Sequence, residues 1–440
     1  MSDTRATIDA IWRLESPRVI AGLARVVRDI GLAEELAQDA LVAALEQWPA
    51  SGIPDNPGAW LMATARHHAL NTLKRGKMAE RKHLDLGRQM DAAAGDADRM
   101  QTELAASMDY NVNDDLLRLV FIACHPVLST EGRVALTLRL LGGLTTDEIA
   151  RAFLTSEPTI AQRIVRAKRT LADQQVAFEV PRRDELDARL ASVLEVVYLI
   201  FNEGYSAAAG DDWMRPGLVE DALRLGRILS GLAPNEPEVL GLLALMELTA
   251  SRAAARTDDA GDPILLMNQD RARWDQLMIR RGLTALARAE ALTAAGVGGG
   301  SAPGVTGAGP YQLQAAIAAC HARAREPGAT DWARIAALYG MLEARAPSPV
   351  VALNRAMAVA MADGPAAGLA LIDALGSEPA LAAYPLLPSA RADLLFKLGR
   401  LAEARVEFER AAALTRNTRL RDRLLARAAQ CGGFPPPANG

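Results

Sequence analysis

The 440-residue sequence is poor in aromatic side chains and in the residue runs that favour β-sheets. Phe, Trp and Tyr together make up 4% of the chain, although hydrophobic residues make up 50% of it, and Ala and Leu dominate them. Sheets are usually built from runs of Val, Ile, Thr and Tyr, which are scarce here. The composition therefore argues against a β-rich fold. It predicts an all-α protein of two or three domains whose helices pack through small residues.

Cysteine is scarce, and long apolar runs are absent. Cys124, Cys320 and Cys431 lie far apart with no CxxC pair, so we expect no disulfide framework, and a reducing cytoplasm fits best. The first ten residues are polar and charged, and no run of about 18 uncharged apolar residues occurs. We therefore expect a soluble, cytoplasmic protein with no signal peptide and no membrane partner.

Signatures of enzymes are missing too. The sequence contains no Gly-rich phosphate loop, no nucleophile elbow and no metalloenzyme pattern. The adjacent pairs Cys124-His125 and Cys320-His321 are possible metal ligands, but no further ligands stand at metal-site spacing, so packing at helix ends is the favoured interpretation. We expect no catalytic residue, no metal and no cofactor, and hence a protein that is not an enzyme.

The chain also lacks an overall positive charge. Its formal net charge is −4 at pH 7, which excludes a protein coated in basic residues. Any nucleic-acid binding must therefore be local, and it would be weak unless a partner contributes.

The most informative stretch that is present runs from Leu144 to Leu171. Thr145 can cap a first short helix, and Glu148 three residues later completes a capping box. Ser156 offers a second cap, and Pro158 is tolerated only in the first turn of the helix that follows. The spacing predicts two helices joined by a tight turn.

The second of these helices has two different faces. One face carries apolar residues at helical spacing, namely Ile160, Ile164, Ala167 and Leu171. The other carries polar and basic residues, namely Gln162, Arg163, Arg166 and Arg169, with Lys168 beside them. An ordinary helical hairpin with a solvated charged face would show the same split. The two caps, the short turn and the clustered arginines favour a DNA-binding helix-turn-helix, whose second helix reads the major groove.

Two further helices near the beginning of the chain differ in charge. In the first, residues 31–48, an acidic stripe lies opposite the apolar face and is either simply solvated or a docking site for a basic partner. After a Pro- and Gly-rich loop at residues 49–58, a helix at Ala59–Arg75 carries basic residues and the polar side chains of His67, His68 and Asn71. Basic residues follow phosphates, and polar side chains between them can meet bases.

This order of an acidic helix, a basic helix containing Trp60-Leu61, a tether and a helix-turn-helix resembles bacterial sigma factors of the extracytoplasmic-function type. Ala33–Leu41 is similar to the family's stretch that binds the β′ clamp of core RNA polymerase. Trp60–Arg75 is similar to its promoter-melting stretch, and Leu144–Arg169 to its −35 module. The resemblance covers residues 5–175 and implies two partners, core RNA polymerase and promoter DNA.

The resemblance also implies roles for individual residues. Polymerase-binding residues would be Glu34, Glu35, Gln38 and Asp39. Residues at the −10 element would be Trp60, Arg66, His67, Asn71, Lys74 and Arg75. Residues at the −35 element would be Thr159, Gln162, Arg163, Arg166, Lys168 and Arg169. His67 stands where the family usually has Asn, which implies a different base preference, and Ala161 stands where a Lys is common, which removes one DNA contact that the resemblance would imply.

The chain continues far beyond residue 175, where an ordinary family member would end. Lys397–Leu414 has Gly399, Leu401, Ala404, Phe408 and Ala411 at the spacing of a tetratricopeptide repeat, and a poorer match precedes it around Gly364. Such repeats stack into a protein-binding groove. The extension resembles that of the family branch whose C-terminal tetratricopeptide-like repeats stand in for a separate anti-sigma protein, which implies a regulatory role and a protein or peptide ligand.

The predicted organisation is sigma region 2 at residues 5–83, a flexible linker at 84–114, sigma region 4 at 115–175, a helical extension at 185–295 and helical repeats at 311–432. A competing hypothesis is a helical-repeat adaptor, or a simple DNA-binding regulator that uses the helix-turn-helix alone. The basic helix at Ala59–Arg75 separates the two hypotheses, because a conventional regulator does not need it.

Overall fold

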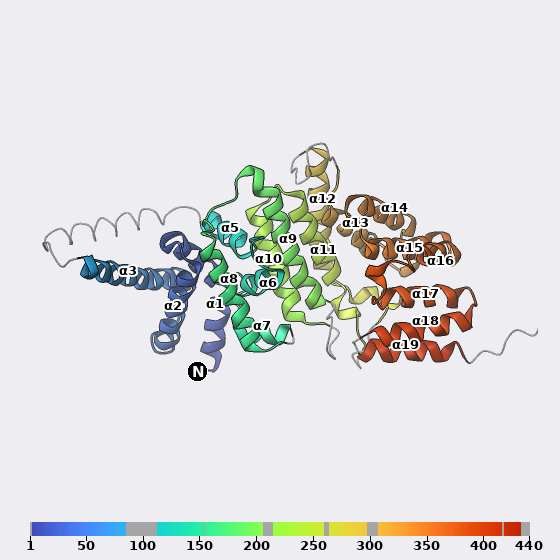
Figure 1. The fold of residues 1–440 in the computed structure, drawn as a ribbon, viewed down its shortest axis with the longest axis horizontal. Coiled ribbons are helices and arrows are strands. Elements are labelled where there is room, and N and C mark those ends of the chain that lie inside the picture. Colours follow the sequence, from blue (N-terminus) through green and yellow to red (C-terminus); the bar gives the residue numbers. More distant parts are fainter. Residues whose placement is uncertain are drawn as a thin grey trace, which may run out of the picture. The chain divides into compact units, whose positions relative to one another are not determined.

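The computed structural model describes residues 2–84, 112–153, 155–205, 214–258, 264–296, 307–415 and 418–432. Their regular elements are α-helices and short 3-10 helices, which confirms the all-α prediction (Figure 1). The chain divides into two compact units, Met1–Leu199 and Ile200–Gly440. Among the described helices, none combines the length and the apolar character that crossing a membrane requires.

The first unit begins with α1 (Ser2–Val27), α2 (Ile30–Ser51) and α3 (Pro57–Leu84), each of which packs against the other two. Trp48 of α2 is buried and meets Trp60 of α3 edge-on, with ring centroids 5.2 Å apart. The loop predicted at residues 49–58 is shorter than expected, because α2 continues through Pro49 to Ser51. The helix predicted at Ala59–Arg75 is longer than expected, since α3 continues to Leu84, where the predicted linker at residues 84–114 begins.

The helices α5 (Val112–Ala123), α6 (Thr130–Leu140), α7 (Thr146–Ala152) and α8 (Glu157–Asp173) complete the next layer of this unit. α8 packs against α6 and α7, and α1 packs against α5. Cys124, just after α5, is buried with its thiol 3.3 Å from the Thr137 hydroxyl, and burial raises its pKa to about 11. Such a thiol is held in its neutral form and acts as a packing group.

The helix α9 (Arg183–Tyr205) begins in this unit, and its first half is tied to α5 and α6. The Ser192 hydroxyl donates to the Cys124 carbonyl at 2.6 Å and accepts from the Arg133 guanidinium at 2.6 Å. Arg189 donates to the Phe121 carbonyl at 3.0 Å. The predicted end of region 4 is residue 175, but α5 and α6 are also supported by the first half of α9 through these bonds.

Replacing Arg133 with alanine is expected to lower the free energy of unfolding of the first unit by about 1–3 kcal/mol, because the buried Ser192 hydroxyl and the partly buried Thr130 hydroxyl lose a charged donor. The control Glu195→Gln removes the charge of the same ion pair at its exposed end. Glu195→Gln should lower the free energy of unfolding by less than about 1 kcal/mol, since half of the Glu195 side chain is exposed. Urea unfolding measures both variants. If both variants lost the same free energy of unfolding, the ion pair with Glu195, and not the hydrogen bonds to the hydroxyls, would account for the contribution of Arg133.

The second unit starts with α10 (Pro216–Leu232), α11 (Pro237–Ala250), α12 (Gln276–Ala294) and α13 (Pro310–Arg323). The apolar α11 lies among the other three and packs against each of them. Within the helical extension predicted at residues 185–295, α11 ends at Ala250 and a 3-10 turn follows at Ala253–Ala255.

Arg271, in the short 3-10 helix Arg271–Arg273, fastens the end of α13. Its guanidinium donates to the carbonyl oxygens of His321 and Ala324 at 2.7 and 2.6 Å and to the Thr330 hydroxyl at 3.1 Å. It also lies over the Trp274 ring, 4.9 Å from the centroid. Arg271 therefore acts as a buried donor to carbonyl oxygens.

His321 makes the stability of this unit sensitive to acid. Burial, with the nearby guanidinium groups of Arg252 and Arg271, lowers the pKa of His321 to about 4. An unfolded chain protonates the same imidazole near pH 6.5. Between these values the unfolded state binds a proton that the folded state does not, so the free energy of unfolding decreases as the pH falls from about 6.5 to 4, by about 1.4 kcal/mol for each pKa unit of difference.

We expect His321→Phe to flatten the pH dependence of urea unfolding between about pH 7 and pH 5, because the ring contact with Trp332 can remain while the proton site is lost. Val406→Phe, which introduces the same side chain at an exposed position of α18, serves as the control and should leave the slope as it is. An identical slope in His321→Phe and the parent protein would contradict the assignment.

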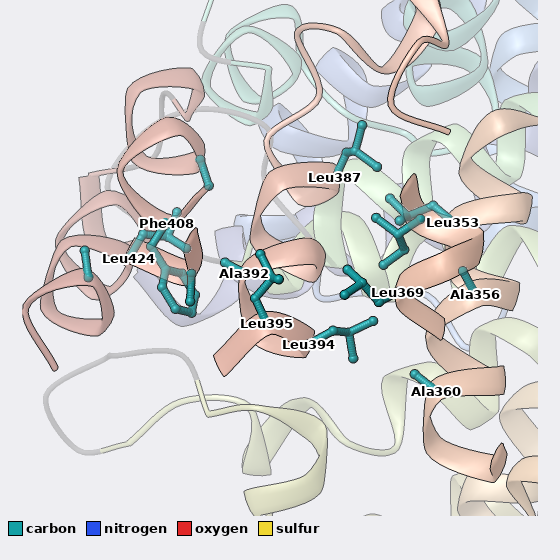
Figure 2. Close-up of a cluster of buried hydrophobic side chains, with 14 of the residues drawn as sticks. Leu353, Ala356, Ala360, Leu369, Leu387, Ala392, Leu394, Leu395, Phe408 and Leu424 are labelled. Carbon is teal, nitrogen blue, oxygen red and sulfur yellow. The ribbon is translucent and has the colours of Figure 1, made fainter. Parts of the chain in front are cut away.

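The unit ends with α14 (Trp332–Arg345), α15 (Pro349–Asp363), α16 (Pro365–Ala374), α17 (Leu386–Lys397), α18 (Leu401–Leu414) and α19 (Thr418–Gln430), and each of these packs against the next. A shared core holds α15 to α19 together (Figure 2). Gly368 marks a close approach, because a Cβ there would lie 2.3 Å from the Ala360 Cβ. This serial packing is what stacked repeats require, and the tetratricopeptide interpretation stays a prediction.

Candidate nucleic-acid interface

The helix-turn-helix forms as the sequence predicts. The Thr145 hydroxyl accepts from the Glu148 amide at 3.2 Å while the Glu148 carboxylate accepts from the Thr145 amide at 2.8 Å, which completes the capping box of α7. The Ser156 hydroxyl caps α8 by accepting from the Thr159 amide. The four apolar positions expected to face inward are all buried, namely Ile160, Ile164, Ala167 and Leu171. These contacts fix the direction in which α8 presents its other face.

The outward face of α8 carries much of the predicted −35 set. Gln162, Arg166 and Arg169 are exposed, and Arg163 and Thr159 are partly exposed. Arg163 and Arg166 line a groove of about 360 Å³ between α8 and the start of α6. Arg169 lies 3.4 Å from the Asp173 carboxylate, but both side chains are largely exposed, so this pair is weak and open to competition by a phosphate. The face offers several guanidinium groups to an anionic partner.

Lys168 lies apart from this face. Its ammonium group pairs with the carboxylate of Glu34, which comes from α2, and only a quarter of the Lys168 side chain is exposed. Lys168, although predicted to contact the −35 element, is therefore paired with a carboxylate of the protein itself.

Of the predicted polymerase-binding residues, some are likewise exposed while Glu34 is buried. Glu35 and Asp39 are exposed on α2, with Asp39 3.8 Å from the His68 ring. Glu34 is only 5% exposed, and its carboxylate accepts from the Gln38 amide at 2.9 Å and from the Arg139 guanidinium at 2.6 Å. The helix thus has an open acidic side and a side on which Glu34 is enclosed.

The predicted −10 residues lie along α3. His67 is exposed and Asn71, one turn later, is partly exposed, with its amide nitrogen 3.4 Å from the His67 Nδ1. Trp60 and Arg66 are partly exposed. The side chains of Lys74 and Arg75 lie outside the described part of the structure. Among the described residues, His67 and Asn71 therefore lie together on one side of α3.

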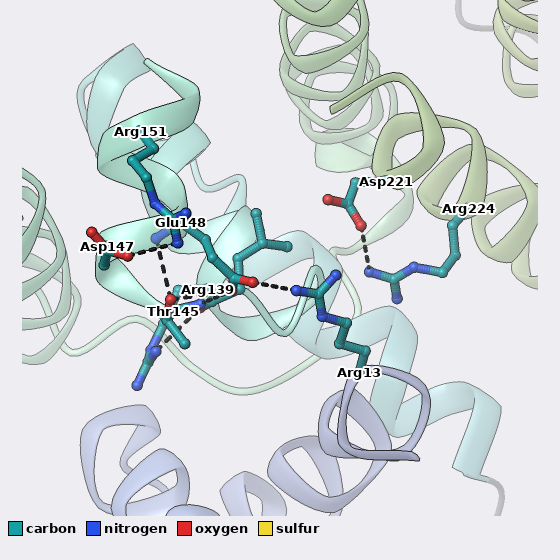
Figure 3. Close-up of polar contacts among 9 residues, drawn as sticks. Arg13, Arg139, Thr145, Asp147, Glu148, Arg151, Asp221 and Arg224 are labelled. Carbon is teal, nitrogen blue, oxygen red and sulfur yellow. Dashed lines mark hydrogen bonds and ion pairs between the residues drawn. The ribbon is translucent and has the colours of Figure 1, made fainter. Parts of the chain in front are cut away.

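Three basic residues that contact acidic side chains near the predicted site residues were not predicted from the sequence. Arg139 of α6 bonds to Glu34, Arg13 of α1 pairs with Glu148 of α7, and Arg25 of α1 lies 3.6 Å from Asp115 (Figure 3 shows Arg13, Glu148 and Arg139). The sequence held a signal for Arg139, which is the one charged residue in the otherwise uncharged second half of α6. Nothing in the sequence pairs Arg13 or Arg25 with a partner, because those partners are distant in the chain.

Three protein-family models match the chain. Sigma-70 region 2 matches residues 11–78, which run from α1 into α3. Sigma-70, region 4 matches residues 118–171, which include the helix-turn-helix. A family of unknown function, DUF6596, matches residues 189–290, from α9 into α12.

The chain is also similar to known bacterial proteins. An uncharacterized protein of Rhizobium meliloti (strain 1021) is 41% identical over 418 residues, which are 95% of this chain and 94% of that protein. A probable ECF RNA polymerase sigma factor, SigI, of Mycobacterium tuberculosis is 27% identical over 173 residues, which are 39% of this chain and 57% of SigI. No solved structure matches. With both sigma-70 regions present in order, the chain belongs to the extracytoplasmic-function branch of the sigma-70 family and carries a C-terminal extension that includes the DUF6596 region.

Proposed function

We propose that the protein binds core RNA polymerase, recognises the −10 and −35 elements of a promoter and starts transcription there, with its C-terminal unit as a regulator. The observation that carries the proposal is the geometry of α8. This helix has a fully buried apolar face, a capped start and an outward face that bears Arg163, Arg166 and Arg169. The arrangement suits a helix that enters the major groove with its polar side toward the bases.

Recognition of the −35 element would rest on these guanidinium groups. An arginine that donates two hydrogen bonds to a guanine contributes about 1–3 kcal/mol of discrimination against other bases. The groove beside Arg163 and Arg166 reaches the start of α6, where the positive end of the helix dipole attracts a phosphate and the Glu131 carboxylate opposes it. Base contacts and backbone contacts would thus come from neighbouring helices.

Recognition of the −10 element would use α3. The exposed His67 ring can stack on an unpaired base, and the Asn71 amide can both donate and accept hydrogen bonds. Trp60 is held by its edge-on contact with Trp48, so its ring is positioned without cost when DNA arrives. Stacking of this kind offsets the few kcal/mol that unstacking a base requires.

Polymerase binding would begin at the exposed carboxylates of Glu35 and Asp39, which offer an acidic surface to a basic clamp. The serially packed helices of the second unit would hold a protein or peptide ligand and so regulate the first.

Affinity capture of purified core RNA polymerase by the full-length protein tests the proposal. We expect binding that Glu35→Lys/Asp39→Lys weakens at least tenfold, because both exposed carboxylates are reversed. Glu409→Lys, an exposed carboxylate of α18, is the matched control and should bind as the parent does. No capture of polymerase by the parent protein would favour the helical-repeat adaptor or the simple DNA-binding regulator instead.

A further inference from the structure

Glu34 joins the two sigma regions directly. It belongs to α2 in region 2, and its carboxylate receives Arg139 of α6 and Lys168 of α8, both in region 4. Arg139 continues the contact by donating to the Leu144 carbonyl at 3.1 Å, at the entrance of the helix-turn-helix. A buried carboxylate held by two cations is stable only while both sides are in place, because separation leaves charged groups without partners.

A second set of contacts lies along α1. Arg13 pairs with Glu148, the residue that completes the capping box of α7, and Arg25 lies 3.6 Å from the buried carboxylate of Asp115 on α5. The backbones also meet closely. Gly143 has φ +68°, and a Cβ placed on it would lie 3.1 Å from the Arg13 Cα and 3.2 Å from the Ser16 hydroxyl oxygen. Ser16 itself is only 1% exposed.

Two residues of this contact lie in segments that have a role in the proposed function. Glu34 is in the acidic stretch proposed to meet polymerase, and Lys168 is on the helix proposed to read the −35 element. While they hold each other, neither is accessible to those partners. Glu35, Asp39, Arg163 and Arg166, which remain exposed, can make a first contact in this state.

We propose that the Glu34–Arg139–Lys168 cluster is a latch that holds regions 2 and 4 in a closed, inactive arrangement until polymerase opens it. The inference rests on the proposed function for what opens the latch. A basic surface that approaches Glu35 and Asp39 competes with Arg139 and Lys168 for the Glu34 carboxylate. When Glu34 binds this basic surface, Lys168 loses its partner and becomes available to DNA. Binding of polymerase thus exposes Glu34 to polymerase and Lys168 to DNA in one step.

The closed state is tested first without polymerase. In the variant Ser16→Cys the new thiol is buried at the contact, and its reaction rate with a maleimide reagent, above the background of the three native cysteines, reports opening. Adding Arg139→Gln should raise this rate at least threefold. Adding Arg151→Gln, an exposed arginine of α7 whose carboxylate partner Asp147 lies on the same helix, should not. Equal rates with and without Arg139→Gln would overturn the latch.

The effect on binding is tested by a reversible lock. Ser16→Cys/Gly143→Cys places one thiol on each side of the contact, since a Cβ on Gly143 would lie 3.2 Å from the Ser16 hydroxyl oxygen that the new sulfur replaces. The single variant Gly143→Cys measures the effect of a side chain at this positive φ by itself. The oxidised protein should capture core RNA polymerase at least tenfold more weakly than the reduced protein, and each single variant should not respond to oxidation.

The outcomes separate the two claims. Equal polymerase capture by the oxidised and reduced forms would overturn the latch while the proposed function stands. If no form captures polymerase, the proposed function fails, and the thiol reaction rates alone decide whether regions 2 and 4 are held closed through Arg139.

Discussion

Replacing Arg163 and Arg166 together with alanine is expected to reduce promoter-dependent transcription by at least tenfold. Both side chains line the groove beside the outward face of α8, and neither is needed to bury its apolar face. Each guanidinium that pairs with a guanine contributes about 1–3 kcal/mol, and about 1.4 kcal/mol corresponds to a factor of ten. The measurement is run-off transcription with core polymerase from a promoter selected out of a randomised DNA library.

The control for this pair is Arg281→Ala, an exposed arginine on α12 of the second unit. It changes the net charge in the same direction without touching α8, and it should leave transcription unchanged. Circular dichroism should show the same helix content in both variants. Unchanged transcription from Arg163→Ala/Arg166→Ala would remove the −35 assignment of α8.

Truncating Phe408 to alanine is expected to lower the free energy of unfolding of the second unit by about 3–5 kcal/mol. The ring is 1% exposed and belongs to the core shared by α15 to α19, where Figure 2 shows it close to Leu424. The Arg427 guanidinium lies over it, 4.8 Å from the ring centroid. Alanine would remove the buried apolar surface, leave a cavity that rigid helices cannot fill, and take away the cation–π contact.

Val406→Ala on the same helix serves as the comparison, because Val406 is exposed and its truncation should cost no more than about 0.5 kcal/mol. Urea unfolding followed by circular dichroism measures both. A loss below about 1 kcal/mol for Phe408→Ala would mean that α18 is not anchored by this ring, and it would weaken the repeat interpretation of the segment.

The helix-turn-helix could be predicted from the sequence because its signals are local. Thr145 and Glu148 are three residues apart, Ser156 stands directly before α8, and the inward positions of α8 recur at helical spacing. The same is true of Phe408 and Ala404, whose spacing on α18 indicated the buried side. Patterns of this length are decided by the hydrogen bonds and the packing of a single helix or hairpin.

The features that could not be predicted depend on residues distant in the chain. Glu34 was expected on an open acidic face, but Arg139 and Lys168 enclose it, and they lie more than a hundred residues away. The ties from α9 to α5 and α6 have the same origin, since nothing near Ser192 shows that Cys124 and Arg133 will meet it. The late end of α3 differs, because its last residues lack the apolar periodicity on which the helix prediction depended.

The most direct test of the central claim is transcription that depends on this protein. Core RNA polymerase is supplied with the full-length chain and the selected promoter, and transcripts are mapped to their start sites. The account predicts a single start downstream of the promoter only when the protein is present, and loss of that start in Arg163→Ala/Arg166→Ala. Transcripts that begin at the same positions and in the same amounts with and without the protein would contradict it.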